Sequence, residues 1–286
     1  VDNVPQVWLA DYSNNNFENR AVTFGWVRRQ TALASKNTNA ASIQMVYAIG
    51  SLGGLMAWTD ENIAGSETVI DSVDRGIRWV DSSNQLVYVK QSGADKGELA
   101  VYDTDTGEDI IITNDGRTKS NPYGWFAPEL RGEMAVLALL DGDTKIGVYK
   151  ETGNEFWQLF RTIRVPDSSK YAYFGSPEPF TAAGKSFISC VIKEKANAYS
   201  HSEVWVFGLD KGVNTTFELN IKDGLGQADR TDPESYIAQN QVFLYYNIKT
   251  NRGDFEAYRA TTGLVTLNDS DLDYHTVFPD ETDANI

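Results

Sequence analysis

The chain has 286 residues, of which 41% are hydrophobic and 12% aromatic, and its 25 basic and 40 acidic residues give a formal charge of −15. An acidic surface of this size repels the phosphates of nucleic acids and anionic lipids, so neither is an expected partner. The single cysteine, Cys190, excludes a disulfide within the chain, and the two histidines, His201 and His275, leave little material for a zinc site. We expect a neutral or cationic ligand.

One further feature concerns membrane spans, and two others favour an exported protein. No run of 18 apolar residues is present, so no membrane-spanning helix is expected. The sequence opens at Val1 without a charged-then-apolar leader, as a mature product does once its signal peptide is removed. Two Asn-X-Ser/Thr acceptor sites, at Asn214 and Asn268, agree with export. We therefore expect a secreted or periplasmic protein; its oligomeric state has no signature in the sequence.

Short apolar segments separated by polar turns make up the first 118 residues. The first group of predicted strands covers 7–10, 22–27, 43–49, 55–58 and 68–71. Its earliest strand is a candidate to join the last group and close a ring. The second group covers 77–81, 86–89, 99–103 and 110–112. Turn residues at close spacing between such strands are typical of an antiparallel meander.

Three more groups of four strands follow the same pattern. The third group covers 125–130, 134–140, 146–149 and 157–160. The fourth covers 174–180, 187–192, 204–207 and 216–219. The fifth covers 232–237, 242–246, 255–259 and 264–267, and the acidic tail at 269–286 contains little that could pack. No segment shows the period of an amphipathic helix, so an α/β fold is not expected.

A Pro-Glu pair recurs near the start of the last three groups. The pairs are Pro128-Glu129, Pro177-Glu178 and Pro233-Glu234, at intervals of 49 and 56 residues. A recurrence of this length is typical of propellers and solenoids, whereas a β-sandwich does not require it. We predict one all-β domain over 1–286, a five-bladed β-propeller with blades at 20–72, 73–118, 119–168, 169–223 and 224–268. A sixth blade would form if residues 1–40 made a degenerate blade of their own.

The carboxylates at the blade heads are the predicted catalytic residues. The first strand of a propeller blade lines the central channel, so residues near its start point toward a common axis. We therefore predict that Asp232, Glu178, Glu129 and Glu234 converge at one mouth of the channel. Clustered carboxylates separate into protonated and ionised groups, as glycoside hydrolysis requires, and they also suit a calcium ion. The structural alternative is that Pro-Glu begins a strand with its charge in water.

Eight further side chains are predicted to contact a substrate. Aromatic rings beside the blade heads suit stacking on sugars, and arginines suit a carboxylate or an acidic sugar. The set comprises Trp26, Trp79, Trp125, Phe126, Tyr173, Arg78, Arg230 and Asp81. Packing between blades is the alternative role for the aromatic residues, and ion pairing is the alternative for the arginines.

Two segments resemble the five-bladed propeller glycoside hydrolases of the arabinanase, xylosidase and levanase type. Residues 125–129, Trp-Phe-Ala-Pro-Glu, resemble the Trp-Ala-Pro-Glu that heads an arabinanase blade, and Asp232-Pro233 resembles the Asp-Pro that carries the general base. The resemblance implies an Asp base, a Glu acid and a second Asp that tunes the acid. In that family the Asp-Pro heads the first blade, whereas here it heads the last. Residues 78–88 and 101–108 also resemble TolB-type repeats, which occur in binding propellers and in some polysaccharide lyases.

The function expected from these features is glycoside hydrolysis. The expected partner is an oligo- or polysaccharide, and the carboxylate chemistry requires no cofactor, although a structural calcium ion is compatible with it. The sequence leaves two alternatives open. One is a non-catalytic propeller that binds a glycan or a peptide, and the other is a polysaccharide lyase.

Overall fold

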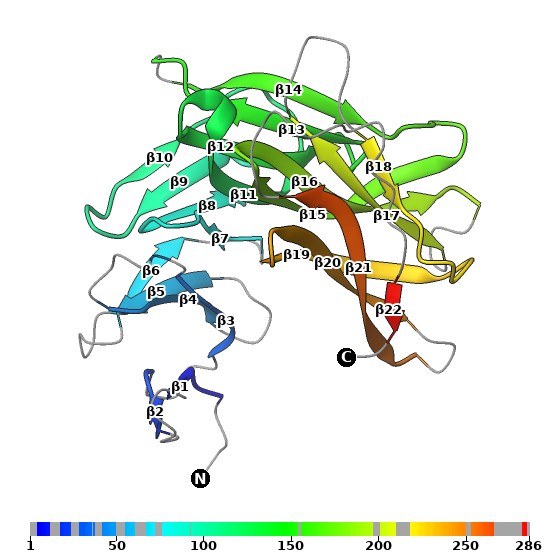
Figure 1. Cartoon of the computed structure of the whole chain (residues 1–286). Coiled ribbons are helices and arrows are strands. Elements are labelled where there is room, and N and C mark those ends of the chain that lie inside the picture. Colours follow the sequence, from blue (N-terminus) through cyan, green and yellow to red (C-terminus); the bar gives the residue numbers. More distant parts are fainter. Residues whose placement is uncertain are drawn as a thin grey trace. The chain divides into compact units, whose positions relative to one another are not determined.

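The structure, a computed structural model, describes residues 5–11, 18–23, 29–35, 37, 42–49, 55–60, 67–71, 76–91, 93–153, 156–196, 201–209, 218–249, 253–265 and 282–284. Within these ranges the chain is all-β, and one 3₁₀ turn, η2 (Pro128–Leu130), interrupts the strands (Figure 1). No helix in the described ranges has the length and apolar character needed to cross a membrane. The chain divides into two compact units, Val1–Arg117 with Pro122–Gly124, and Thr118–Asn121 with Trp125–Ile286.

The first unit contains two four-stranded meanders and a two-stranded ribbon. The ribbon pairs β1 (Trp8–Asp11) with β2 (Glu18–Ala21). The first meander runs β3 (Arg29–Ala34), β4 (Gln44–Ile49), β5 (Leu55–Asp60) and β6 (Thr68–Asp71). The second runs β7 (Arg78–Trp79), β8 (Gln85–Val89), β9 (Leu99–Asp103) and β10 (Asp109–Ile111). Val46, Leu86 and Tyr88 belong to one buried apolar cluster that joins the two meanders.

Three further four-stranded meanders follow, and they make up most of the second unit. The first runs β11 (Lys119–Ala127), β12 (Glu133–Leu140), β13 (Lys145–Lys150) and β14 (Gln158–Arg164). The next runs β15 (Tyr171–Ala182), β16 (Lys185–Glu194), β17 (Ser202–Gly208) and β18 (Glu218–Ile221). The last runs β19 (Asp229–Ala238), β20 (Gln241–Lys249), β21 (Phe255–Val265) and β22 (Thr282–Ala284).

The sheets β15–β18 and β19–β22 pack face to face. Every second residue of β20 is buried, from Val242 to Ile248, because successive side chains of a strand point to opposite faces. These residues share one apolar cluster with Val191, Val204 and Val206 of the neighbouring sheet. In contrast, β16 is buried without interruption from Ser186 to Ile192, since both of its faces are covered. This packing fixes β15 beside β19, which is the arrangement that the functional site requires.

The predicted all-β architecture of successive four-stranded units is confirmed, with two differences at the ends of the chain. The predicted strand at 7–10 exists as β1 but pairs with β2, so it does not complete the last sheet. That sheet is completed by β22, which lies along β21 and comes from the tail that was expected to pack poorly (Figure 1). The strands predicted at 255–259 and 264–267 are largely one continuous strand, β21. The number of blades and the closure of a ring stay predictions.

Candidate functional site

The first strands of three successive sheets share an unusual backbone conformation immediately before a proline. Asn121, Ser176 and Asp232 have φ of 47°, 45° and 50°, and Pro122, Pro177 and Pro233 follow them. Residues with a side chain rarely adopt positive φ, and Asn and Asp tolerate it best. The intervals between the three positions are 55 and 56 residues. The structural repeat is therefore this residue–proline pair and not Pro-Glu.

This repeat corrects the predicted alignment at Glu129. Pro128 and Glu129 do not head a strand but form the 3₁₀ turn η2 after β11. The next strand begins nine residues after Ser176 and after Asp232, but twelve residues after Asn121. The three additional residues equal the length of η2, so the turn is an insertion into the repeat. The matching position in that sheet is Asn121-Pro122.

Two of these positive-φ residues, Ser176 and Asp232, sit at β-bulges. One extra residue on β15 lies between Gly175 and Glu178, and one on β19 lies between Thr231 and Glu234. A bulge bends its strand and redirects the side chain of the extra residue. Ser176 Oγ donates a hydrogen bond to Asp232 Oδ1 at 2.8 Å. The bulges of two neighbouring sheets thus meet through their side chains.

A buried serine joins the same two strands through their backbone. Ser189 of β16 is fully buried, and its hydroxyl lies 2.9 Å from the carbonyl oxygen of Pro233 and 3.3 Å from that of Glu178. The hydroxyl proton is shared between these two acceptors. Asp232 and Glu234 are exposed, and Glu178 is half-buried. The structure therefore brings the fourth and fifth predicted blade heads together.

Glu129 and Trp125 are engaged in a separate contact between η2 and β16. Glu129 Oε1 accepts a hydrogen bond from the Ser186 backbone N–H at 2.6 Å, and Oε2 accepts one from Ser186 Oγ at 2.7 Å. The indole N–H of Trp125 donates to the same Oγ at 3.0 Å, and Trp125 is only 3% exposed. This network gives both side chains a clear structural role.

The remaining predicted contacts are distributed over both units. In the first unit, Trp79 is buried and donates to the Leu33 carbonyl at 3.0 Å, Arg78 contacts Tyr123 by a hydrogen bond and over its ring, and Asp81 is exposed. In the second unit, Phe126 is 40% exposed and Tyr173 is half-buried. Trp26 lies outside the described residues.

Arg230 lines a cavity, but its guanidinium is occupied by the surrounding backbone and by Asp223. Nε and Nη2 donate to the Asp223 carboxylate, each at 2.5 Å. The other donors reach the carbonyl oxygens of Ser202 at 2.8 Å, Ala228 at 3.2 Å and Gly226 at 3.3 Å. A guanidinium has five N–H donors, and all five are used here. Arg230 therefore fixes the loop that leads into β19.

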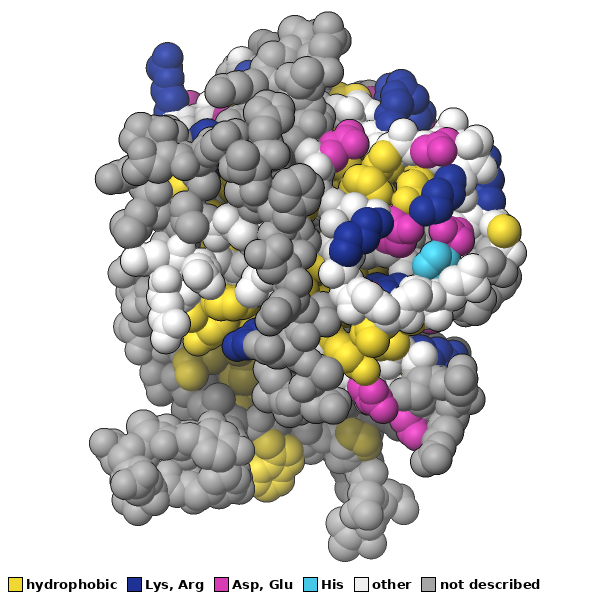
Figure 2. All heavy atoms as spheres, turned by 45° about the vertical axis from the view of Figure 1, so that its right-hand side comes forward, with side chains coloured by type: hydrophobic (Ala, Val, Ile, Leu, Met, Phe, Trp, Pro, Cys, Tyr) yellow, Lys and Arg dark blue, Asp and Glu magenta, His cyan; other side chains and the backbone are white. Residues whose placement is uncertain are grey.

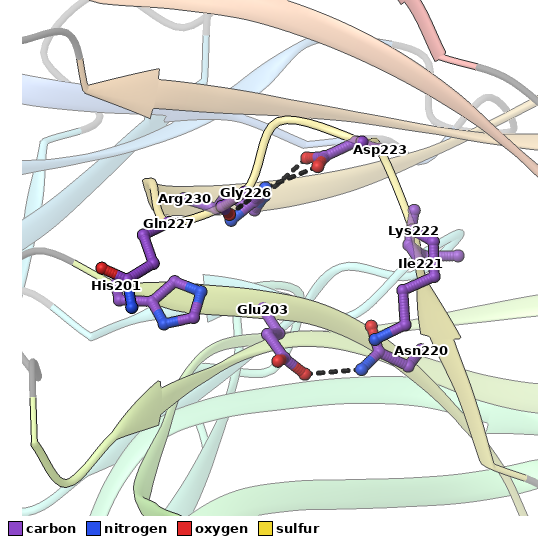
Figure 3. Close-up of a pocket in the computed structure, with 10 residues that line it drawn as sticks. His201, Glu203, Asn220, Ile221, Lys222, Asp223, Gly226, Gln227 and Arg230 are labelled. Carbon is purple, nitrogen blue, oxygen red and sulfur yellow. Dashed lines mark hydrogen bonds and ion pairs between the residues drawn. The ribbon is translucent and has the colours of Figure 1, made fainter.

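The cavity has a volume of about 500 Å³ and lies among β17, β18 and the residues between β18 and β19 (Figure 3). It is a feature that sequence reasoning missed. Arg230 and Asp223 point toward each other on one side of it, and Glu203 faces Asn220 on the other (Figure 3). The lining residues lie close together in the chain, between His201 and Arg230, but their order carries no recognisable motif.

An ion-pair network borders this cavity. Lys170 Nζ lies 2.7 Å from Glu203 Oε1 and 3.3 Å from Glu194 Oε1, and His201 Nδ1 lies 2.6 Å from Glu194 Oε2. Glu203 Oε2 also accepts hydrogen bonds from Tyr171, Asn220 and Trp205. Figure 2 shows basic and acidic side chains side by side around the histidine on this face.

The network keeps its carboxylates ionised. Burial raises the pKa of Glu203, but hydrogen bonds from Lys170 and Tyr171 outweigh burial and lower that pKa to about 2. The pKa of Glu194 is also lowered, because His201 and Lys170 outweigh burial. The pKa of Asp223 is lowered in the same way by Arg230. These carboxylates are therefore structural anions and do not serve as proton donors near neutral pH.

No protein-family model matches this sequence, and no curated protein is significantly similar to it. Solved structures with a similar fold exist, and three illustrate the range. The periplasmic gluconolactonase PpgL of Pseudomonas aeruginosa has a TM-score of 0.50 at 12% identity, over 88% of this chain and 69% of that one. Oligopeptidase B from Trypanosoma brucei has a TM-score of 0.50 at 6% identity, over 91% of this chain and 35% of that one. A GH43 β-1,3-galactosidase has a TM-score of 0.42 at 12% identity, over 65% of this chain and 42% of that one.

The two neighbours with a TM-score of 0.50 support a β-propeller fold and nothing finer. The repeated meander sheets of this chain agree with the propeller architecture of the neighbours. At such identities the likeness concerns the fold alone, and a gluconolactonase and an oligopeptidase show how far activities diverge on it. The chain spans less than half the length of the oligopeptidase and of the galactosidase.

Proposed function

We propose that this chain is an exported, carbohydrate-active propeller that hydrolyses a glycosidic bond in an oligo- or polysaccharide. Asp232 acts as base or nucleophile, Glu178 acts as general acid, and Glu234 lies on the same strand as Asp232. The observation that carries the proposal is the hydrogen bond from Ser176 to Asp232, which joins two blade heads that bear carboxylates. Glycoside hydrolysis requires two such carboxylates, one protonated and one ionised.

The geometry favours Glu178 over Glu129 as the acid. Both carboxylate oxygens of Glu129 are already engaged, since each accepts a hydrogen bond from Ser186. Glu178 lies on β15, whose backbone Ser189 ties to Pro233 beside Asp232. The Ser176 hydroxyl holds the Asp232 carboxylate beside β15, the strand that carries Glu178.

The test is turnover of a panel of plant and bacterial polysaccharides, measured as new reducing ends. Asp232→Asn should abolish turnover and leave the thermal unfolding midpoint unchanged, whereas Asp95→Asn, a change at another exposed aspartate, should leave turnover intact. Full activity in Asp232→Asn would remove the assignment. An unsaturated, ultraviolet-absorbing product would replace hydrolysis by lyase chemistry. Saturable glycan binding without products would indicate a binding propeller.

A further inference from the structure

We infer that the cavity beside β17 and β18 is a ligand site of its own, and that it takes a neutral polyhydroxylated molecule of mono- or disaccharide size. None of the carboxylates proposed for hydrolysis lines it. Its volume of about 500 Å³ falls within the range of small-molecule sites, roughly 300–1,000 Å³. The inference requires no hydrolysis and so does not depend on the proposed function.

The cavity wall is preformed. The Arg230 and Asp223 side chains are only 5% and 4% exposed, and their ion pair holds residues 223–228 against the start of β19. Asp223 additionally accepts hydrogen bonds from the Leu225 backbone N–H and from Tyr246, each at 3.0 Å. A rigid wall does not have to be ordered by its ligand, which removes one cost of binding.

The charges of the site are balanced, which favours a neutral ligand. Three carboxylates, of Glu194, Glu203 and Asp223, face three cationic side chains, of Lys170, Lys222 and Arg230. An ionic ligand would have to separate pairs that already satisfy one another. Burial makes that separation unfavourable, since a buried charge that loses its partner is left without compensating solvation.

The same balance argues against a metal ion. Ligand atoms of Glu194, His201 and Glu203 lie within 4.8 Å of one another, which is compatible with a metal site in principle. However, Lys170 already supplies positive charge to both glutamates. Glu203 also accepts hydrogen bonds from four donors, so a metal would have to displace several of them.

One acceptor in the wall is left for a ligand. Asn220 Oδ1 is buried and accepts no hydrogen bond from any described group. The amide cannot turn over to relieve this, because its Nδ2 donates to the Glu203 carboxylate and a carbonyl oxygen in that place would be repelled. An unsatisfied buried acceptor is destabilising, so a ligand O–H is favoured where a small shift of the Asn220 side chain brings Oδ1 to the cavity surface.

The rim provides the complementary groups. Lys222 and Gln227 are exposed at the mouth of the cavity, and both can donate hydrogen bonds (Figure 3). Donors thus lie on two opposite sides of the cavity (Figure 3). Hydroxyl groups both donate and accept, so a ring that carries several of them matches this wall without any net charge.

The experiment is calorimetric titration of the whole chain with neutral monosaccharides and disaccharides, and separately with glucuronate, ZnCl2 and CaCl2. Gln227→Trp should close the mouth and weaken saccharide binding at least tenfold, whereas Gln158→Trp, a matched change at an exposed glutamine on β14, should not change it. Asn220→Ala should weaken binding about tenfold. Unfolding midpoints of all three variants verify that each one folds.

Saccharide binding that survives Gln227→Trp at full strength, or no saccharide binding at all, overturns the inference. Zinc or calcium binding that Glu194→Gln abolishes, without saccharide binding, replaces it by a metal site. Tighter binding of glucuronate than of glucose contradicts the neutral ligand. Asp232→Asn should bind monosaccharides as the unchanged chain does. A loss of turnover alone in Asp232→Asn therefore tests hydrolysis, whereas a loss of saccharide binding alone in Gln227→Trp tests the cavity.

Discussion

The buried hydroxyl of Ser189 donates to the carbonyl oxygen of Pro233, 44 positions later in the chain, at 2.9 Å. This contact crosses from sheet β15–β18 to sheet β19–β22 at the bulge that presents Asp232. A bulge leaves backbone groups outside the regular ladder, and buried ones need another partner. Ser189 supplies that partner and fixes the two blade heads relative to each other.

We predict that Ser189→Ala destabilises the protein by about 1–3 kcal/mol, because the Pro233 carbonyl oxygen loses its donor. The measurement is urea unfolding followed by tryptophan fluorescence. Ser176→Ala is the control, since its contact with Asp232 is exposed and its loss should cost less than about 1 kcal/mol. Equal losses in the two variants would refute a special structural role for Ser189.

A larger loss is expected at Arg230. Arg230→Met leaves the Asp223 carboxylate buried with its main counter-charge removed, which costs about 3–5 kcal/mol. The same substitution at Arg164, an exposed position on β14, should change the free energy of unfolding by less than about 0.5 kcal/mol. Combining Arg230→Met with Asp223→Asn should recover part of the loss. A single substitution at Arg230 that costs no more than Arg164→Met would contradict the five-donor arrangement.

Acid should unfold the protein partly through Glu203. Its pKa is about 2 in the folded chain against 4.5 for an unperturbed glutamate, so the unfolded state binds the proton more readily. The stabilisation is fully present above pH 4.5 and is lost as pH falls from there toward 2. The full shift would correspond to about 3 kcal/mol, and solvent screening at this partly exposed carboxylate reduces the contribution below that value. In Glu203→Gln the free energy of unfolding should depend less steeply on pH within this window; an unchanged slope would remove the assignment.

Much of the fold could be predicted from the sequence, because it is local. Apolar alternation and turn residues locate most strands, and the groups at 73–118, 119–168 and 169–223 each contain one meander. The fourth strand of the last sheet could not be predicted, since β22 is short and separated from β21 along the chain. The first sheet begins at Arg29, after the predicted 22–27, of which residues 24–27 lie outside the described part.

The site was harder to predict, because its contacts are between sheets. Asp232 and Glu178 could be found from the residues next to proline. Their partners Ser176 and Ser189 carry no comparable signal, although aligning Ser176-Pro177 with Asp232-Pro233 would have revealed the first. Glu129 was misaligned because η2 inserts three residues into the repeat. The sequence indicates Arg230 as a ligand contact. Its five hydrogen-bond acceptors show that it fixes the loop that leads into β19.

The roles of Glu129 and Glu178 can be separated by one pair of variants. Glu129→Gln removes the charge that the Ser186 N–H and hydroxyl stabilise, so the free energy of unfolding should fall by about 1–3 kcal/mol while kcat per folded molecule stays within about twofold. Glu178→Gln should instead lower kcat and leave the free energy of unfolding nearly unchanged. A lost general acid lowers kcat by about 10²–10⁴-fold, and the half-buried position on β15 should tolerate an amide with little loss of stability.

Turnover and urea unfolding measured on the same preparations decide whether Glu129 or Glu178 is the general acid. A substrate with a good leaving group should restore activity selectively in Glu178→Gln, because such a leaving group departs without being protonated by the acid. If Glu129→Gln loses turnover at unchanged stability, and the activated substrate restores it, then Glu129 is the acid. In that case its contact with Ser186 orients a catalytic group at η2, and the pair at β15 and β19 serves to hold the two sheets together.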